Sequence, residues 1–340
     1  MRVALVALLT MLVLGTPGWG IAGPYEDGAA AYGKGEYTAA LSLLRPLAEQ
    51  GDSRAQTLVG KLYMSGGGVP QDFAQAAGWY TKAADQGHSI AQFNLGLLYQ
   101  AGQGVPKDLA KAAQWYRKAA EQGLAEAQTS LAIIYADGIG LPQDDTQSVF
   151  WYRKAAEQGY VPAQFFLGWA YANGQGVPQD HAQAALLYRQ AAEQGDVKAQ
   201  YYLGGMYANG VGVPKDYAQA VSWFRPAAEQ GDDKAQYLLG GMYFRGVGVL
   251  QDFVSAAFWL RKAAEQGNAS AQFNFGLMYL AGSGQPQDDV MAYKWFNLAA
   301  AAGGADAAKV RDELVAWMTP AQVAEAQKLS REWRPAGGGR

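Results

Sequence analysis

The chain has 340 residues, half of them hydrophobic, with 27 lysines and arginines against 30 aspartates and glutamates, and no cysteine. The near-balanced charge, without a recurring basic stripe, argues against nucleic-acid binding, which needs clustered positive charge. Without cysteine, no disulfide framework and no lipid-bearing cysteine is available, so we do not expect a lipoprotein.

Residues 1–22 have the pattern of a secretory signal peptide. A single arginine precedes an apolar run over residues 3–14, and Gly20 and Ala22 are the small residues that a cleavage site requires at its −3 and −1 positions. An uncleaved anchor is disfavoured because about twelve apolar residues fall short of the ~20 in a spanning helix. We expect a periplasmic or secreted protein with no integral membrane segment after cleavage.

A repeat with a period of 36 residues organises residues 51–302. The glycine that opens each unit recurs as Gly51, Gly87, Gly123, Gly159, Gly195, Gly231, Gly267 and Gly303. A fixed period of this size indicates a solenoid, in which each unit buries its apolar face against its neighbours. Residues 23–50 fall partly in phase with the later units, which predicts a degenerate first unit that caps the N-terminal end of the array.

The first half of each unit predicts an amphipathic helix, called helix A. In the unit that opens at Gly195, the spacing i, i+4, i+8 places Ala199, Leu203 and Tyr207 on one helical face. Six of the seven units also carry a glycine in mid-helix, Gly204 in this one, although glycine costs roughly 1 kcal/mol relative to alanine there. The recurring glycine predicts a partner helix that packs too closely for a side chain.

A glycine-rich turn and a second helix, called helix B, complete the unit. Gly210 and Gly212 favour the positive φ angles of a helix end and a turn, and Pro214 follows them. Asp216 is the predicted N-cap of helix B. Columns of alanine and tryptophan along helix B allow close packing between layers. Each unit is therefore predicted to be a helix–turn–helix.

The period decays after residue 302, and residues 303–334 predict two C-terminal capping helices. The second begins at Thr319, with Pro320 at the first helical position and Gln322 placed to complete a capping box. Residues 335–340 are expected to form a flexible tail.

The full repeat motif resembles that of the Sel1-like repeat family, which is related to tetratricopeptide repeats. One unit carries Ala91-Gln92, Leu95-Gly96, Tyr99, Gly102, Gly104-Val105-Pro106, Asp108, Ala112, Trp115-Tyr116, Ala119-Ala120 and Gly123. This resemblance implies an all-α fold, a right-handed α/α superhelical solenoid of helix–turn–helix repeats. It also implies protein–protein interaction, often in signalling or envelope assemblies, and makes residues 23–50 similar to a plain tetratricopeptide repeat.

The sequence offers no catalytic or metal-binding constellation. Its two histidines, His88 and His181, lie in different columns of different units, whereas a metal site needs three or four converging ligands. Some relatives in the resembled family are described as β-lactamases, yet no serine here is followed by lysine at the third place and no Lys-Thr-Gly occurs. We expect a protein without enzymatic activity, cofactor or metal, and a hydrolase is the less favoured alternative.

Helix-A positions that point away from the inter-repeat columns predict a groove on the concave side. The candidate binding residues are Phe165, Trp169, Tyr201, Tyr237, Phe244 and Phe273. Aromatic anchors often dominate binding, so we expect the groove to take an extended peptide or a partner's helix. Two alternatives stay open: the first aromatic column packs between repeats, or the rings stack on sugars. The expected function is a scaffold or adaptor of the bacterial cell envelope, and the alternative is a cell-wall or carbohydrate-binding protein.

Overall fold

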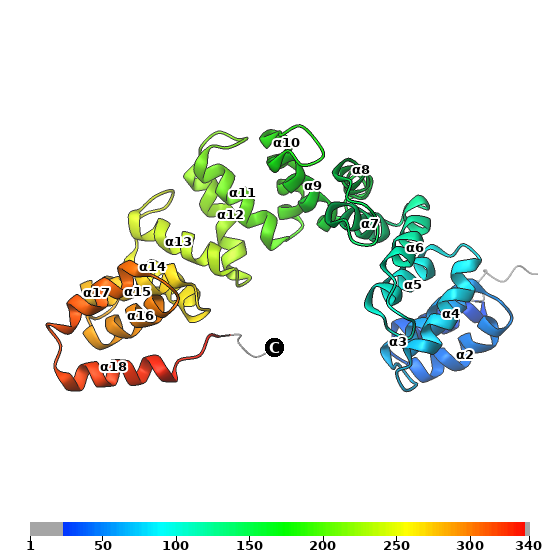
Figure 1. The fold of residues 1–340 in the computed structure, drawn as a ribbon, viewed down its shortest axis with the longest axis horizontal. Coiled ribbons are helices and arrows are strands. Elements are labelled where there is room, and N and C mark those ends of the chain that lie inside the picture. The colour runs from blue at the N-terminus through cyan, green and yellow to red at the C-terminus, as the bar shows by residue number, and fades with distance from the viewer. Residues whose placement is uncertain (1–22, 337–340) are drawn as a thin grey trace, which may run out of the picture. The chain divides into compact units, whose positions relative to one another are not determined.

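The computed structural model describes residues 23–336, and this part of the chain forms 18 α-helices and no strand (Figure 1). The expected signal peptide at 1–22 lies outside the described residues, as do the last four residues of the expected tail. Helices α1 (Pro24–Gly33) and α2 (Tyr37–Glu49) pack against each other where the degenerate first unit is expected.

Seven helix pairs follow, one in each period of the repeat. The helices A are α3 (Ser53–Ser65), α5 (Ser89–Ala101), α7 (Ala125–Asp137), α9 (Val161–Asn173), α11 (Val197–Asn209), α13 (Asp233–Arg245) and α15 (Ala269–Ala281). The helices B are α4 (Phe73–Asp85), α6 (Leu109–Glu121), α8 (Asp145–Ala156), α10 (His181–Glu193), α12 (Tyr217–Glu229), α14 (Phe253–Glu265) and α16 (Asp289–Ala301). Each helix A contacts its own helix B. The predicted helix–turn–helix repeat is confirmed.

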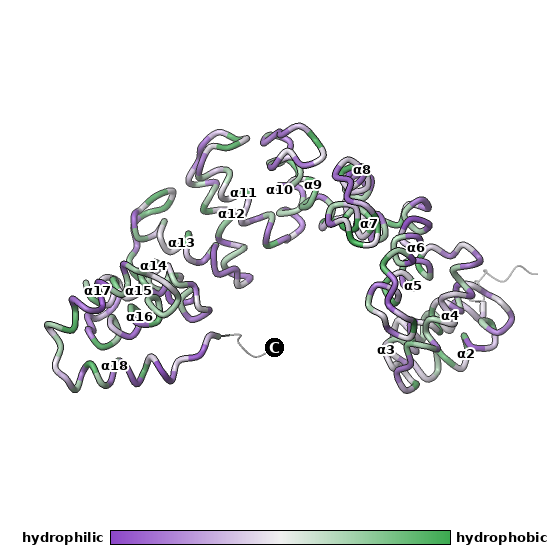
Figure 2. The backbone as a smooth tube through the Cα atoms, in the orientation of Figure 1, coloured by the Kyte–Doolittle hydropathy of each residue, from purple (hydrophilic) through white to green (hydrophobic). Residues whose placement is uncertain are grey.

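The chain divides into two compact units at Gly123. The first contains α1 to α6, and the second contains α7 to the last helix. Within each, every helix B also contacts the next helix A, so the helices stack in chain order. Figure 2 shows hydrophilic and hydrophobic stretches alternating within individual helices. Over residues 23–336, no helix combines the length and the apolar character that crossing a membrane requires.

The predicted caps and turns are present in the unit that opens at Gly195. The carboxylate of Asp216 accepts hydrogen bonds from the backbone N–H groups of Ala218 and Gln219, and so caps α12. Gly212 has φ of 71°, a value that suits glycine. A Cβ atom on Gly212 would collide with the backbone carbonyl of His181 in the preceding helix B. The second glycine of the turn is therefore also a point of close approach to the previous repeat.

A ladder of glutamine side chains links helix A to its own helix B and to the helix B of the previous repeat. Nε2 of Gln230 donates to Oε1 of Gln200 at 3.0 Å, and Nε2 of Gln200 donates to the backbone oxygen of Ala192 at 3.1 Å. Gln200 is buried, so these bonds satisfy an amide that water does not reach. The same bond between two side chains recurs in the pairs Gln86–Gln56, Gln122–Gln92, Gln158–Gln128, Gln194–Gln164 and Gln266–Gln236.

Two further helices, α17 (Ala305–Val315) and α18 (Pro320–Glu332), both contact α16. The capping box predicted for α18 is confirmed: Oγ1 of Thr319 accepts from the N–H of Gln322 at 3.3 Å, and Oε1 of Gln322 accepts from the N–H of Thr319 at 2.9 Å. After α18 the chain returns toward α14, where the N–H of Ala336 donates to the backbone oxygen of Glu265 at 2.7 Å.

Candidate functional site

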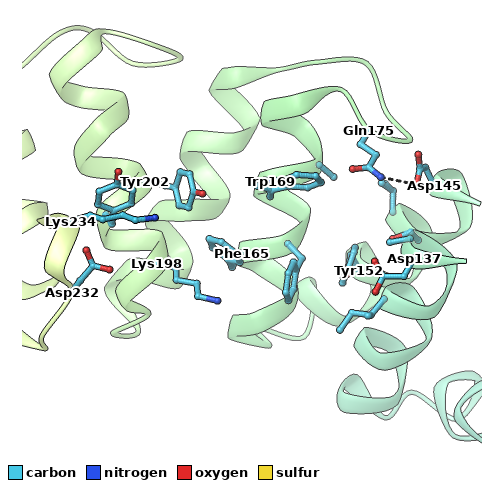
Figure 3. A pocket seen from close by; sticks show the side chains of 17 residues that line it. Asp137, Asp145, Tyr152, Phe165, Trp169, Gln175, Lys198, Tyr202, Asp232 and Lys234 are labelled. Atoms are coloured by element: carbon cyan, nitrogen blue, oxygen red, sulfur yellow. Dashed lines mark hydrogen bonds between the residues drawn. The ribbon is translucent and has the colours of Figure 1, made fainter. Parts of the chain in front are cut away.

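A groove of about 600 Å³ lies on the second compact unit, over α7, α8, α9, α11 and α13 (Figure 3). Its aromatic lining consists of Tyr152, Phe165, Phe166, Trp169, Tyr201 and Tyr202. Its charged lining consists of Asp137, Asp145, Lys198, Asp232 and Lys234. The groove thus draws side chains from four successive helices A and extends over more than one repeat.

Two of the groove's rings are open to solvent. Trp169 is 39% exposed and Tyr202 is 42% exposed. The ring of Tyr202 stacks on that of Tyr188, with centroids 5.5 Å apart and planes 19° apart. Tyr188 is itself buried in the core and close to Phe165. The exposed ring of Tyr202 is therefore held in place by a packed neighbour.

The first predicted aromatic column packs between repeats and also borders the groove. Phe165 is only 8% exposed, and its ring centroid lies 5.7 Å from that of Tyr188 in the same repeat and 5.8 Å from that of Tyr202 in the next repeat. Tyr201 is half-buried, with its ring 6.1 Å from that of Phe224. Burial raises the pKa of the Tyr201 hydroxyl, the nearby Lys234 lowers it, and Asp232 raises it further. Among the predicted site residues of this groove, Trp169 therefore presents the most open ring.

The six predicted site residues are distributed over three pockets. Phe165, Trp169 and Tyr201 line the groove of Figure 3. Phe244 lines a second pocket of about 430 Å³ between α13 and α15, beside Gly241. Tyr237 and Phe273 line a third pocket of about 260 Å³. The structure thus brings three of the predicted residues together and places the other three elsewhere along the array.

The prediction from sequence missed Tyr202, Phe166 and Tyr152. Tyr202 and Phe166 each follow a residue of the predicted column directly, as the second ring of a Tyr-Tyr or Phe-Phe pair. Tyr152 lies on helix B and stacks on Phe166, with centroids 5.4 Å apart. The adjacent aromatic pairs were the signal that would have found two of the three.

The charged groups of the groove are separated by sign. Figure 3 shows Asp137 and Asp145 on one side of the central rings, and Lys198 and Lys234 on the other. Asp232 lies with the lysines, but its carboxylate accepts from the N–H of Ala235 at 2.7 Å and so caps α13.

The two lysines and Asp137 have no ion-pair partner among residues 23–336. Oδ1 of Asp145 accepts from Nε2 of Gln175 at 2.9 Å, which leaves its charge without a cation. The groove therefore has two carboxylates on one side, and two ammonium groups with one carboxylate on the other, so that its two sides differ in the sign of their net charge.

No metal site is evident in the described part of the chain, where no three His, Asp or Glu side chains gather. His88 belongs to the first compact unit, and its Nδ1 atom lies 3.0 Å from Oγ1 of Thr57. Burial lowers the pKa of its ring. This contact joins the ends of two neighbouring helices A rather than lining a pocket.

The family model described as Sel1 repeat matches seven consecutive segments, residues 53–88, 89–124, 125–160, 161–196, 197–232, 233–268 and 269–304. A Sel1 repeat protein from Oxalobacter formigenes is 40% identical with a TM-score of 0.66, over 85% of this chain and 86% of that one. A protective antigen of uropathogenic Escherichia coli strains, described as displaying an SLR fold, is 34% identical with a TM-score of 0.57, over 92% of this chain and 76% of that one. A comparison with curated proteins gave no match.

Proposed function

The chain belongs to the Sel1 repeat family, and from this membership we propose that it is a non-enzymatic scaffold that binds a peptide or a partner protein in the groove of α7 to α13. Sel1 repeat proteins are in general scaffolds for protein interaction.

The observation that carries the proposal is the exposure of Trp169 and Tyr202 in one groove. Aromatic side chains bury large areas on binding and lose little rotamer freedom, so a few of them dominate many interfaces. Since Tyr202 already stacks on the buried Tyr188, little further ordering is needed when a partner covers it.

A role in the bacterial cell envelope is the second part of the proposal. It rests on the signal-peptide pattern of residues 1–22. The full chain, fused at its C-terminus to a reporter enzyme that is active only outside the cytoplasm, is expected to show reporter activity. Deletion of residues 1–22 should abolish that activity. Equal activity of both fusions would contradict export.

Photocrosslinking in intact cells tests the groove. A photoreactive phenylalanine analogue at Tyr202 keeps a ring at the exposed position, and the same analogue at the exposed Gln190 on α10 is the control outside the groove lining. Mass spectrometry should identify a protein adduct from position 202 and none from position 190.

Two other outcomes have distinct meanings. Adducts from position 202 to cell-wall fragments alone would replace the protein partner with a carbohydrate, which stacks on aromatic rings. Adducts from position 190 alone would move the binding surface to the helix-B face and contradict the proposal.

A further inference from the structure

We propose that the groove selects an extended peptide with a cationic side chain near Asp137, an apolar side chain over the central rings, and a carboxylate near Lys198 and Lys234. This inference rests on the proposed peptide-binding function and specifies the chemistry of the partner. It follows from three features of the groove: its floor, its basic side and its acidic side.

The floor is apolar and contiguous. Phe166 stacks on Tyr152 with centroids 5.4 Å apart, and Phe166 and Phe165 meet edge to face at 5.4 Å. Trp169 lies one turn along α9 from Phe165, and part of its ring is exposed to solvent. An aliphatic or aromatic side chain of a bound peptide would cover these rings and be removed from water.

The basic side consists of Lys198 on α11 and Lys234 on α13. Nζ of Lys198 lies 5.9 Å from the ring centroid of Phe165, which directs the ammonium group over the floor. The carboxylate of Asp232, which also lines this side, is engaged in capping α13. The two ammonium groups outnumber the one carboxylate, so this side has a net positive charge, which attracts a carboxylate more strongly in a concave site than on a flat surface.

The acidic side consists of Asp137, the last residue of α7, and Asp145, the first residue of α8. A carboxylate at a helix C-terminus is unfavourable because the helix dipole is negative there. Asp137 is the one carboxylate at its position of the repeat, where the other helices A carry Ser65, Ala101, Asn173, Asn209, Arg245 and Ala281. Asp137 lines the groove, where its charge adds to burial in raising the pKa of Tyr152. A bound cation would relieve this repulsion.

The size of the groove fits an extended peptide. Because an α-helix with its side chains is ~10–12 Å across, two steps along the array, from α7 past α9 to α11, cover a distance on the order of 20 Å. An extended chain advances ~3.3 Å per residue, so about six residues would reach from the acidic side to the basic side.

The test uses six-residue synthetic peptides that share an apolar centre and differ at their ends. The two mixed peptides carry Arg and Glu in the two possible orders, and the others carry two Arg, two Glu or two Gln. Their termini are blocked and each bears a fluorophore, so that anisotropy with the full-length mature protein reports affinity. One of the two mixed peptides should bind at least tenfold more tightly than each of the three peptides with identical ends. This preference should weaken with added salt.

Charge reversal gives a change of specificity that loss of folding would not produce. The double variant Lys198→Glu/Lys234→Glu should prefer the peptide with two Arg ends. The double variant Asp137→Lys/Asp145→Lys should prefer the peptide with two Glu ends. Lys262→Glu, an exposed change on α14 outside the groove lining, is the control and should keep the wild-type preference.

The peptide measurements distinguish a wrong charge pattern from the absence of peptide binding. Equal affinity for all peptides, lost in Trp169→Ala, would overturn the charge pattern and leave the groove as a peptide site. If no peptide binds, the inference is overturned, and the crosslinking at position 202 decides whether a larger partner still occupies the groove.

Discussion

Gly204 on α11 lies against the ring of Phe224 on α12, so that a Cβ atom on residue 204 would sit 2.7 Å from Cδ1 of that ring. Gly205, the next residue, has no atom within 4 Å of the place where its own Cβ atom would lie. Two adjacent glycines in one helix therefore serve different purposes, and only the first is required by packing.

This difference predicts opposite effects of the same substitution. Gly205→Ala should stabilise the protein by up to about 1 kcal/mol, because alanine is the better helix former and meets no neighbour. Gly204→Ala should destabilise it by about 1–3 kcal/mol, because the methyl group overpacks the interface with Phe224. Urea unfolding followed by circular dichroism measures both. Stabilisation by both substitutions would contradict this prediction, because it would show that α11 and α12 can move apart at little cost in free energy.

The glutamine ladder predicts a coupled pair. Gln200→Leu removes the acceptor of the Gln230 amide and should lower the free energy of unfolding by about 1–2 kcal/mol. The double variant Gln200→Leu/Gln230→Leu should recover part of that loss, since no amide is then left without its partner. Gln190→Leu, at an exposed position, is the control and should change stability by less than about 0.5 kcal/mol. Strictly additive effects would mean that the bond contributes nothing.

Buried tyrosines predict a loss of stability in alkali. Burial raises the pKa of Tyr188 above its usual value of 10.0, so the folded state holds this proton more tightly than the unfolded state does. Its stabilising contribution is complete below pH 10 and is lost as the pH rises toward the folded-state pKa. Tyr188→Phe should keep stability at neutral pH, because Phe224 and Phe296 occupy the equivalent position in other repeats.

Above pH 10, Tyr188→Phe should unfold with a shallower pH dependence than the wild type, by up to about 1.4 kcal/mol per pH unit. Urea unfolding between pH 7 and pH 11 checks this difference. Identical pH profiles of the two proteins would contradict a protected Tyr188 hydroxyl.

The proposed function predicts a separation between binding and stability at Trp169. Trp169→Ala should reduce recovery of the partner at least tenfold, as expected for an aromatic anchor. Because Trp169 is 39% exposed, the substitution should lower the free energy of unfolding by about 1–2 kcal/mol, less than the loss of a fully buried tryptophan. Tyr237→Ala is the matched control, since Tyr237 lines a different pocket. Undiminished recovery with Trp169→Ala would contradict the groove.

The sequence predicts those features of the fold that depend on short-range chemistry repeated in phase. The cap at Asp216 and the capping box of Thr319 and Gln322 need only neighbouring residues, and both are confirmed. The glycine at 204 was interpretable because its column persists through the repeats. The bond between Gln200 and Gln230 was not, because it joins side chains 30 residues apart, and a glutamine column does not reveal its partner.

The groove was predictable in part. Helical phase identified the face that carries Trp169, but it did not determine how far each ring reaches toward the next repeat, which decides whether a side chain packs or stays open. Tyr202 was not predicted because the residue type at its position varies from repeat to repeat, with Leu58, Asn94 and Ser130 at the equivalent positions. A site that interrupts the periodic pattern is invisible to an argument from periodicity.

The close approach of Gly212 to His181 has a consequence for biosynthesis. The glycine-rich turn fits against the helix B that precedes it in the chain, and the side chain of Gln200 on α11 reaches back to Ala192 on α10 of the previous repeat. Within each compact unit, a segment that emerges from the ribosome therefore finds its docking surface already made. The array is built to assemble in the order of translation, from the N-terminus onward, without waiting for residues that have yet to appear.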